Sequence, residues 1–223
     1  MAWTRRAGRT AALALALTFA WPLASQSLAD GGDDAVAVSP EARGVAQAVT
    51  AAELADWGRR RNDAGALIMA ARLLAEVPVR RGDEGTAPIL TPERLLDEAA
   101  ELAAGDQPLM HAIDRLRDPL TRGVRSSPFG LGPVFTVKQL RAREAWVFEV
   151  EARPREVLRV AAIGDGDTDI DLAIRNARGE VICRAGFGGH YPVCTVSPRG
   201  GGKMRVDIVN RGDVWTSIQV LSN

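Results

Sequence analysis

Hydrophobic residues recur with a helical period in the first half of the chain and with a period of two in the second half. Between residues 39 and 118, apolar side chains return every three or four positions, as at Leu67, Ala71 and Leu74, which is the spacing of one helix face. From Val134 onward apolar and polar residues alternate, as they do in half-buried β-strands. The pattern therefore predicts an α+β chain with a small α-helical domain followed by an all-β domain.

Five helices are predicted in the first half, and small residues between their apolar positions favour packing as αα-hairpins. Their starts are marked by capping residues or by proline, which satisfy or dispense with the free N–H groups of a first turn. The predicted starts lie at Ser39, Thr50, Asn62-Asp63, Thr91 and Pro108. The last helix is expected to stop before Pro119, because proline lacks the N–H of a helical hydrogen bond.

The second half is predicted to be an antiparallel β-sandwich of about eight short strands, because turn signals separate its alternating segments at regular intervals. Glycine and proline recur over residues 119–133 and disfavour both helix and strand, so this segment is expected to be a linker. The predicted organisation is a helical domain at 39–118, a linker at 119–133 and a sandwich at 134–223.

The first 29 residues have the pattern of a secretory signal peptide. A positive stretch ends at Arg9 and precedes an apolar run over residues 11–20, and the small residues Ser27 and Ala29 suit a signal peptidase. The apolar run is shorter than the roughly 20 residues that a membrane-spanning helix needs. We therefore expect Sec-type export to the periplasm or the cell exterior, with no transmembrane anchor after cleavage.

Export gives the two cysteines a structural meaning. Cys183 and Cys194 lie in neighbouring predicted strands, and an even number of cysteines in an oxidising compartment indicates a disulfide. A bridge that closes so short a loop stabilises a fold by about 3 kcal/mol in the chain-entropy model. A metal site with His190 as a further ligand and a nucleophilic cysteine are the alternatives.

Four aspartates, Asp165, Asp167, Asp169 and Asp171, alternate along a turn that runs into a predicted strand. A glycine-containing turn can fold oxygen ligands around a hard cation, so Asp165, Asp167 and Asp169 are candidate calcium ligands. The EF-hand pattern is not met, because Ile170 stands where that loop requires glycine. In the structural alternative, the first two aspartates bond to the turn backbone and the last two face solvent from the strand.

Composition and motifs argue against nucleic-acid binding and against catalysis. Basic and acidic residues balance at 28 each, so no net field attracts nucleic acid. The sequence contains no Gly-x-Ser-x-Gly elbow, His-Glu-x-x-His helix or phosphate-binding loop. Only His111 and His190 offer imidazole bases, and His111 lies among apolar neighbours of a predicted helix, where a structural histidine is usual.

The segment between the cysteines is the candidate ligand loop. Phe187, His190 and Tyr191 lie there among glycines, and binding residues favour loops that a rigid scaffold presents. We therefore predict that these three side chains contact a ligand.

The second half also resembles a known family, the bacterial pre-peptidase C-terminal (PPC) domain. The resemblance extends over residues 134–223. The segments that carry it are 146–150, 158–160, 167–172, the turn at Gly179 and 204–210. It implies a non-catalytic accessory sandwich with a role in binding or stability, and calcium in some members. The helical domain resembles no family.

These features together predict an exported, non-catalytic binding or accessory protein. Its expected partner is a protein or glycan of the cell envelope, with the helical hairpins facing a protein partner; apart from the calcium alternative, no cofactor is expected. The alternative function is an unrecognised secreted hydrolase, or its accessory subunit, with its site between the two domains.

Overall fold

A computed structural model describes most of the chain, namely residues 36–82, 87–122 and 127–223, without the side chains of 119–122. Residues Asp34–Asn223 form one compact unit. The predicted signal peptide lies outside the described residues, as do positions 123–126 of the predicted linker. In the described ranges we find no helix with the length and apolar character needed to span a bilayer.

The described residues before Val134 contain four helices: α1 (Pro40–Arg61), α2 (Ala64–Ala75), α3 (Pro92–Leu102) and α4 (Gln107–Arg122). Three of them begin at predicted caps. The side chains of Ser39, Asp63 and Thr91 each accept a hydrogen bond from a first-turn N–H, which satisfies a donor that has no partner inside the helix. The left-handed backbone of Asn62 ends α1 and turns the chain into α2.

Two predicted helix boundaries are wrong. The helices expected to start at Ser39 and Thr50 are one helix, because the Thr50 hydroxyl donates to the Ala46 carbonyl within α1 and does not cap a new helix. The last helix does not stop before Pro119 but continues to Arg122. The φ that proline fixes is compatible with a helix, so Pro119 did not end α4, although it lacks the N–H of one helical hydrogen bond.

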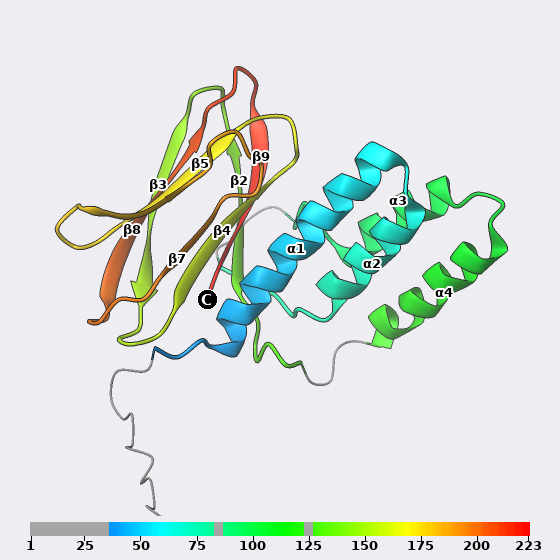
Figure 1. The fold of residues 1–223 in the computed structure, drawn as a ribbon, viewed down its shortest axis with the longest axis horizontal. Helices are drawn as coiled ribbons and strands as arrows, with labels where there is room; N and C mark the ends of the chain where they lie inside the picture. The colour runs from blue at the N-terminus through cyan, green and yellow to red at the C-terminus, as the bar shows by residue number, and fades with distance from the viewer. Residues whose placement is uncertain (1–35, 83–86, 123–126) are drawn as a thin grey trace, which may run out of the picture. The chain divides into compact units, whose positions relative to one another are not determined.

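Eight strands follow from Val134, and the predicted antiparallel β fold is confirmed. Their bounds are β2 (Val134–Leu140), β3 (Ala145–Ala152), β4 (Leu158–Gly164), β5 (Ile170–Arg175), β6 (Val181–Ala185), β7 (Val193–Val196), β8 (Gly202–Asn210) and β9 (Thr216–Ser222). One sheet has the order β2-β9-β4-β7 and is extended by the short parallel β1 (Arg80–Arg81), and the other has the order β3-β8-β5-β6. Figure 1 shows the two layers.

Two hydrophobic clusters hold the fold together. One fills the space between the sheets, where residues such as Ile170, Leu172 and Ile208 are fully buried. The other joins the helices to the outer face of the sheet that contains β4 and β9, since Ile163 and Leu221 are buried in the same cluster as Leu67 and Leu95. Strands β4 and β9 are consequently buried on both faces.

The predicted disulfide is confirmed. Cys183 on β6 and Cys194 on β7 are bonded, with their Cα atoms 5.8 Å apart. These two strands are edge strands of different sheets, so the bridge joins the two layers at one open side of the sandwich. Because both sulfur atoms are bonded, neither thiolate is left for the metal or nucleophile alternatives.

Candidate functional site

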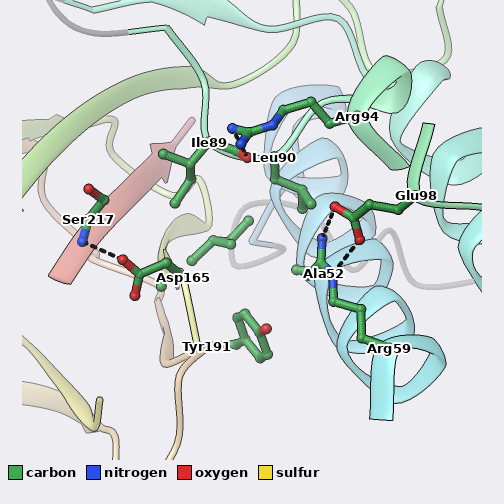
Figure 2. A pocket seen from close by; sticks show the side chains of 11 residues that line it. Ala52, Arg59, Ile89, Leu90, Arg94, Glu98, Asp165, Tyr191 and Ser217 are labelled. Carbon is green, nitrogen blue, oxygen red and sulfur yellow. Dashed lines mark hydrogen bonds and ion pairs between the residues drawn. The ribbon is translucent and has the colours of Figure 1, made fainter. Parts of the chain in front are cut away.

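A pocket of about 380 Å³ lies where the helices meet one end of the sandwich. Its lining comes from α1, α3 and the segment before α3 on the helical side, and from β4, β9 and the loop before β7 on the other. The apolar wall includes Ile89, Leu90 and Ile163, and the polar groups belong to Arg59, Arg94, Glu98, Asp165, Tyr191 and Ser217. Figure 2 shows these side chains around the pocket.

The sandwich side of the pocket is fixed by the end of β4. Gly164 donates its N–H to the carbonyl of His190 at 3.0 Å, which ties the loop before β7 to this strand. A Cβ at Gly164 would lie 2.6 Å from the Ile170 side chain, so glycine permits this close approach. The next residue, Asp165, accepts hydrogen bonds from the Ser217 N–H at 2.8 Å and the Thr216 hydroxyl at 2.6 Å.

The helical side of the pocket carries a bidentate ion pair. Arg59 on α1 donates from Nε and Nη2 to the two carboxylate oxygens of Glu98 on α3, at 2.7 and 2.9 Å. The hydrogen bond to Glu98 raises the pKa of Arg59 and outweighs the opposite effect of burial. The pair joins the two helices, and its two charges neutralise each other.

Two further charges face the pocket without such a partner. Arg94 donates from Nη1 to the backbone carbonyl of Ile89 at 3.0 Å, and Asp165 accepts only from hydroxyl and backbone groups. Among the described residues, neither side chain takes part in an ion pair. The pocket therefore presents a cation from α3 and an anion from the sandwich that remain available to a ligand.

The three residues of the predicted ligand loop have different surroundings in the structure. Tyr191 lines the pocket and is half-buried, and burial raises the pKa of its hydroxyl to about 12. His190 does not line the pocket, and its Nδ1 lies 2.6 Å from the Thr168 carbonyl, so a proton on Nδ1 completes this hydrogen bond. Phe187 points away into solvent with 85% of its surface exposed.

The aspartate side chains of the acidic turn likewise have different surroundings. Asp165 is held by β9, whereas Asp169 accepts a hydrogen bond from the Gly188 N–H at 3.1 Å. Asp167 is exposed. In the part of the chain that the structure describes, no three or more His, Cys, Asp or Glu side chains gather as a metal-binding group. A calcium ion needs several converging oxygens, and binding of calcium by Asp165, Asp167 and Asp169 stays a prediction.

Comparisons with known proteins give a limited likeness. Neither a scan against protein-family models nor a search of curated proteins found a match. Among solved structures, the chain is similar to the pre-peptidase C-terminal domain of collagenase from Bacillus anthracis, with 6% sequence identity, coverage of 40% of this chain and 88% of that chain, and a TM-score of 0.33. A de novo designed double-stranded β-helix is similar over 40% of this chain and 97% of its own, with 16% identity and a TM-score of 0.26. At TM-scores this low, membership of the PPC family stays a prediction.

Sequence reasoning found Tyr191 and Asp165 but missed the helical side of the pocket. Arg59 lies in a run of three arginines whose sequence pattern is that of a solvated helix surface. Its partner Glu98 is 39 positions away in the sequence, so no short-range spacing of residues predicts this ion pair. Only the packing of α1 and α3 against the same helix, α2, brings the two side chains together.

Proposed function

We propose that this chain is an exported, non-catalytic binding protein whose pocket receives a polar part of a protein or glycan partner. The observation that carries the proposal is the presence of Arg94 and Asp165 as oppositely charged groups that lie on different walls of one pocket and lack ion-pair partners among the described residues. Charge-assisted hydrogen bonds are the strong ones in recognition, and a few placed polar groups beside an apolar wall are typical of binding sites.

The chemistry of the lining supports binding over hydrolysis. Ser217 is the one hydroxyl nucleophile candidate among the lining residues, and no histidine or cysteine lies beside it in the described lining. Tyr191, with a pKa of about 12, stays protonated near neutral pH and makes a poor general base there. The Asp165 carboxylate accepts from the Ser217 N–H and the Thr216 hydroxyl and not from the Ser217 hydroxyl. A serine whose hydroxyl has no base bonded to it is a weak nucleophile.

The disulfide and the sequence resemblance agree with the proposed role. A disulfide such as Cys183–Cys194 persists in oxidising compartments, which supports a periplasmic or extracellular location. The resemblance to PPC domains implies an accessory sandwich and not a catalytic one.

Binding to the pocket can be tested on the full mature chain with a panel of short peptides and soluble oligosaccharides, followed by calorimetric titration. We expect at least one probe to bind, and Arg94→Gln to weaken that binding about tenfold or more, which is the loss of one charge-assisted hydrogen bond. The matched control is Arg117→Gln, since Arg117 on α4 pairs with Asp97 and lies outside the pocket lining.

The hydrolase alternative is tested with the same protein. Peptide, ester and glycoside substrates should show no turnover. Turnover that Asp165→Asn, His111→Ala or His190→Ala abolishes would overturn the proposal, as would probe binding that is unaffected by Arg94→Gln.

A further inference from the structure

A small hollow of about 100 Å³ lies on the outer face of the β3-β8-β5-β6 sheet, away from the pocket described above. Ala173 on β5 pairs with Arg184 on β6 and with Asp207 on β8. Asp171 and Arg175 are the neighbours of Ala173 on the same face of β5, because side chains two positions apart share a face. A methyl group surrounded by longer charged side chains leaves the hollow open above it.

Arginine predominates around this hollow. Its lining contains three arginines, Arg175, Arg184 and Arg211, and two carboxylates, Asp171 and Asp207. Nε of Arg211 donates to Asp171 at 2.7 Å and Nε of Arg175 donates to Asp207 at 2.6 Å. The lining therefore keeps one positive charge in excess.

Asp207 stays ionised within these pairs. Asp207 also accepts from Nε of Arg205 at 2.7 Å. Burial acts to raise the pKa of Asp207, but the hydrogen bonds from Arg175 and Arg205 outweigh it and hold the pKa below its ordinary value. With Arg205 counted, four guanidinium groups share two carboxylates. Arg175 also donates from Nη1 to the carbonyl of Gly179 at 3.1 Å.

Arg184 supplies the excess charge. Within the described residues its side chain makes no hydrogen bond or ion pair, and its backbone is fixed next to Cys183, which the disulfide anchors. A guanidinium in this position can bind a carboxylate or sulfate in bidentate fashion without first breaking an ion pair.

An exposed aromatic residue with a strained backbone follows three positions after Arg184. Phe187 has a left-handed backbone with φ of +58°, between Gly186 and Gly188, which also have positive φ. That conformation costs an L-residue roughly 1–3 kcal/mol, yet 85% of the Phe187 surface is exposed, so the fold gains little burial in return. Residues that keep a strained backbone cluster at functional sites, so the strain at Phe187 supports a binding role.

The loop that carries Phe187 turns directly over the rim of the hollow. A Cβ at Gly186 would overlap the carboxylate of Asp171, and the N–H of Gly188 donates to Asp169, the next acidic residue on that face. These two contacts fix the backbone on either side of Phe187, next to Asp171 and Asp169.

We propose that Phe187 and the arginines of this hollow form a binding site for an acidic glycan, a saccharide that carries carboxylate groups. The flat C–H face of a sugar ring packs on an exposed aromatic ring, while guanidinium groups bind its carboxylates. An acidic peptide would use the arginines without requiring the aromatic platform, and a neutral glycan would leave Arg184 without a role. The site is separate from the pocket, so it stands or falls independently of the function proposed above.

Calorimetric titration of the full mature chain with an oligogalacturonate tests this site, with a neutral oligosaccharide of equal length as the comparison. We expect the acidic probe alone to bind, with an affinity that falls as ionic strength rises. Arg184→Gln should weaken binding about tenfold or more. Arg178→Gln, at an exposed arginine paired with Glu180 outside the hollow, should leave it unchanged.

Phe187→Gly separates a binding role from a structural one. Glycine takes the left-handed backbone without strain, so this variant should melt at the same or a higher temperature than the parent chain while it binds the oligogalacturonate about tenfold more weakly or worse. The proposal would be overturned if the neutral probe bound as tightly as the acidic one, or if the acidic probe did not bind. It would also be overturned if an oligoglutamate bound as tightly as the oligogalacturonate and its affinity were unchanged by Phe187→Gly.

Discussion

At the scale of single residues, environment decides what a side chain can do. Tyr191 and His190 are adjacent in the sequence and were both predicted to contact a ligand, but their settings differ. The imidazole is occupied with the Thr168 carbonyl, whereas the phenol lies half-buried in the pocket lining. The residue types and their spacing in the sequence indicated this loop as a candidate ligand-binding segment. The direction of each side chain follows from the hydrogen bonds that tie the loop to β4.

Titration of Tyr191 provides a direct test of its setting. It is the only tyrosine in the chain, so the ultraviolet absorbance of tyrosinate reports this residue alone. Burial stabilises the neutral phenol and raises its pKa to about 12, and we expect the folded protein to titrate there. A midpoint at the ordinary value of about 10 would contradict the half-buried setting.

The same pKa shift sets the sign of a stability change. Because the folded-state pKa of Tyr191 is the higher one, its contribution to stability is complete below the unfolded value and is lost as pH rises from about 10 to about 12. Tyr191→Phe should reduce this part of the alkaline decline, as measured by chemical denaturation across that range.

Asn210 shows what a residue type cannot reveal on its own. In the sequence it marks a turn after a strand, but in the fold it is fully buried. Its amide donates to the carbonyls of Arg141 and Val214, and its side-chain oxygen accepts from Thr168 and Gly212. Three turns are joined at this end of the sandwich by one side chain, because a buried amide must satisfy all its polar atoms.

At the scale of elements, periodicity predicted the type of most segments and erred at their ends. The alternation from Val134 gave eight strands because one face of most strands is buried and the other is not. Thr50 and Pro119 were wrongly taken as boundaries, since local capping or breaking tendencies are weaker than the continuation of a helix that tertiary packing supports.

The disulfide acts at this scale, because it joins the edge strands β6 and β7 of two different sheets. Replacing both Cys183 and Cys194 by alanine should lower the free energy of unfolding by about 3 kcal/mol, mainly by freeing the unfolded chain. Urea unfolding of the variant measures the loss. The parent chain under reducing conditions should show a similar decrease, and unchanged stability in both would contradict the prediction.

At the scale of the whole molecule, the helices and the sandwich share one buried cluster. Phe135, Val137, Ile163 and Leu221 line the outer face of the β2-β9-β4-β7 sheet and are buried under the helices. The predicted boundaries at 118 and 134 mark a change of secondary structure, but they do not by themselves say whether either part folds alone.

A fragment of residues 134–223 tests this dependence. Without the helices, the apolar outer face of the first sheet would be exposed as one contiguous patch, and such patches drive association. We expect the fragment to aggregate or to bind a hydrophobic dye, in contrast to the mature chain, as followed by light scattering and dye fluorescence. A monomeric fragment that unfolds as cooperatively as the mature chain would show that the sandwich is autonomous.

The sequence by itself determined that helices are followed by strands and that the two cysteines pair, because these depend on local periodicity and on the presence of only two thiols. It also indicated the loop that contains Phe187 and Tyr191. The tertiary structure alone decided which charges meet. Arg59 reaches Glu98 across 39 positions, and Asp165 reaches Ser217 across 52. Such pairs depend on distances in space, which a pattern of hydrophobic and polar positions does not encode, so the pocket and the arginine-lined hollow emerge only when the elements pack.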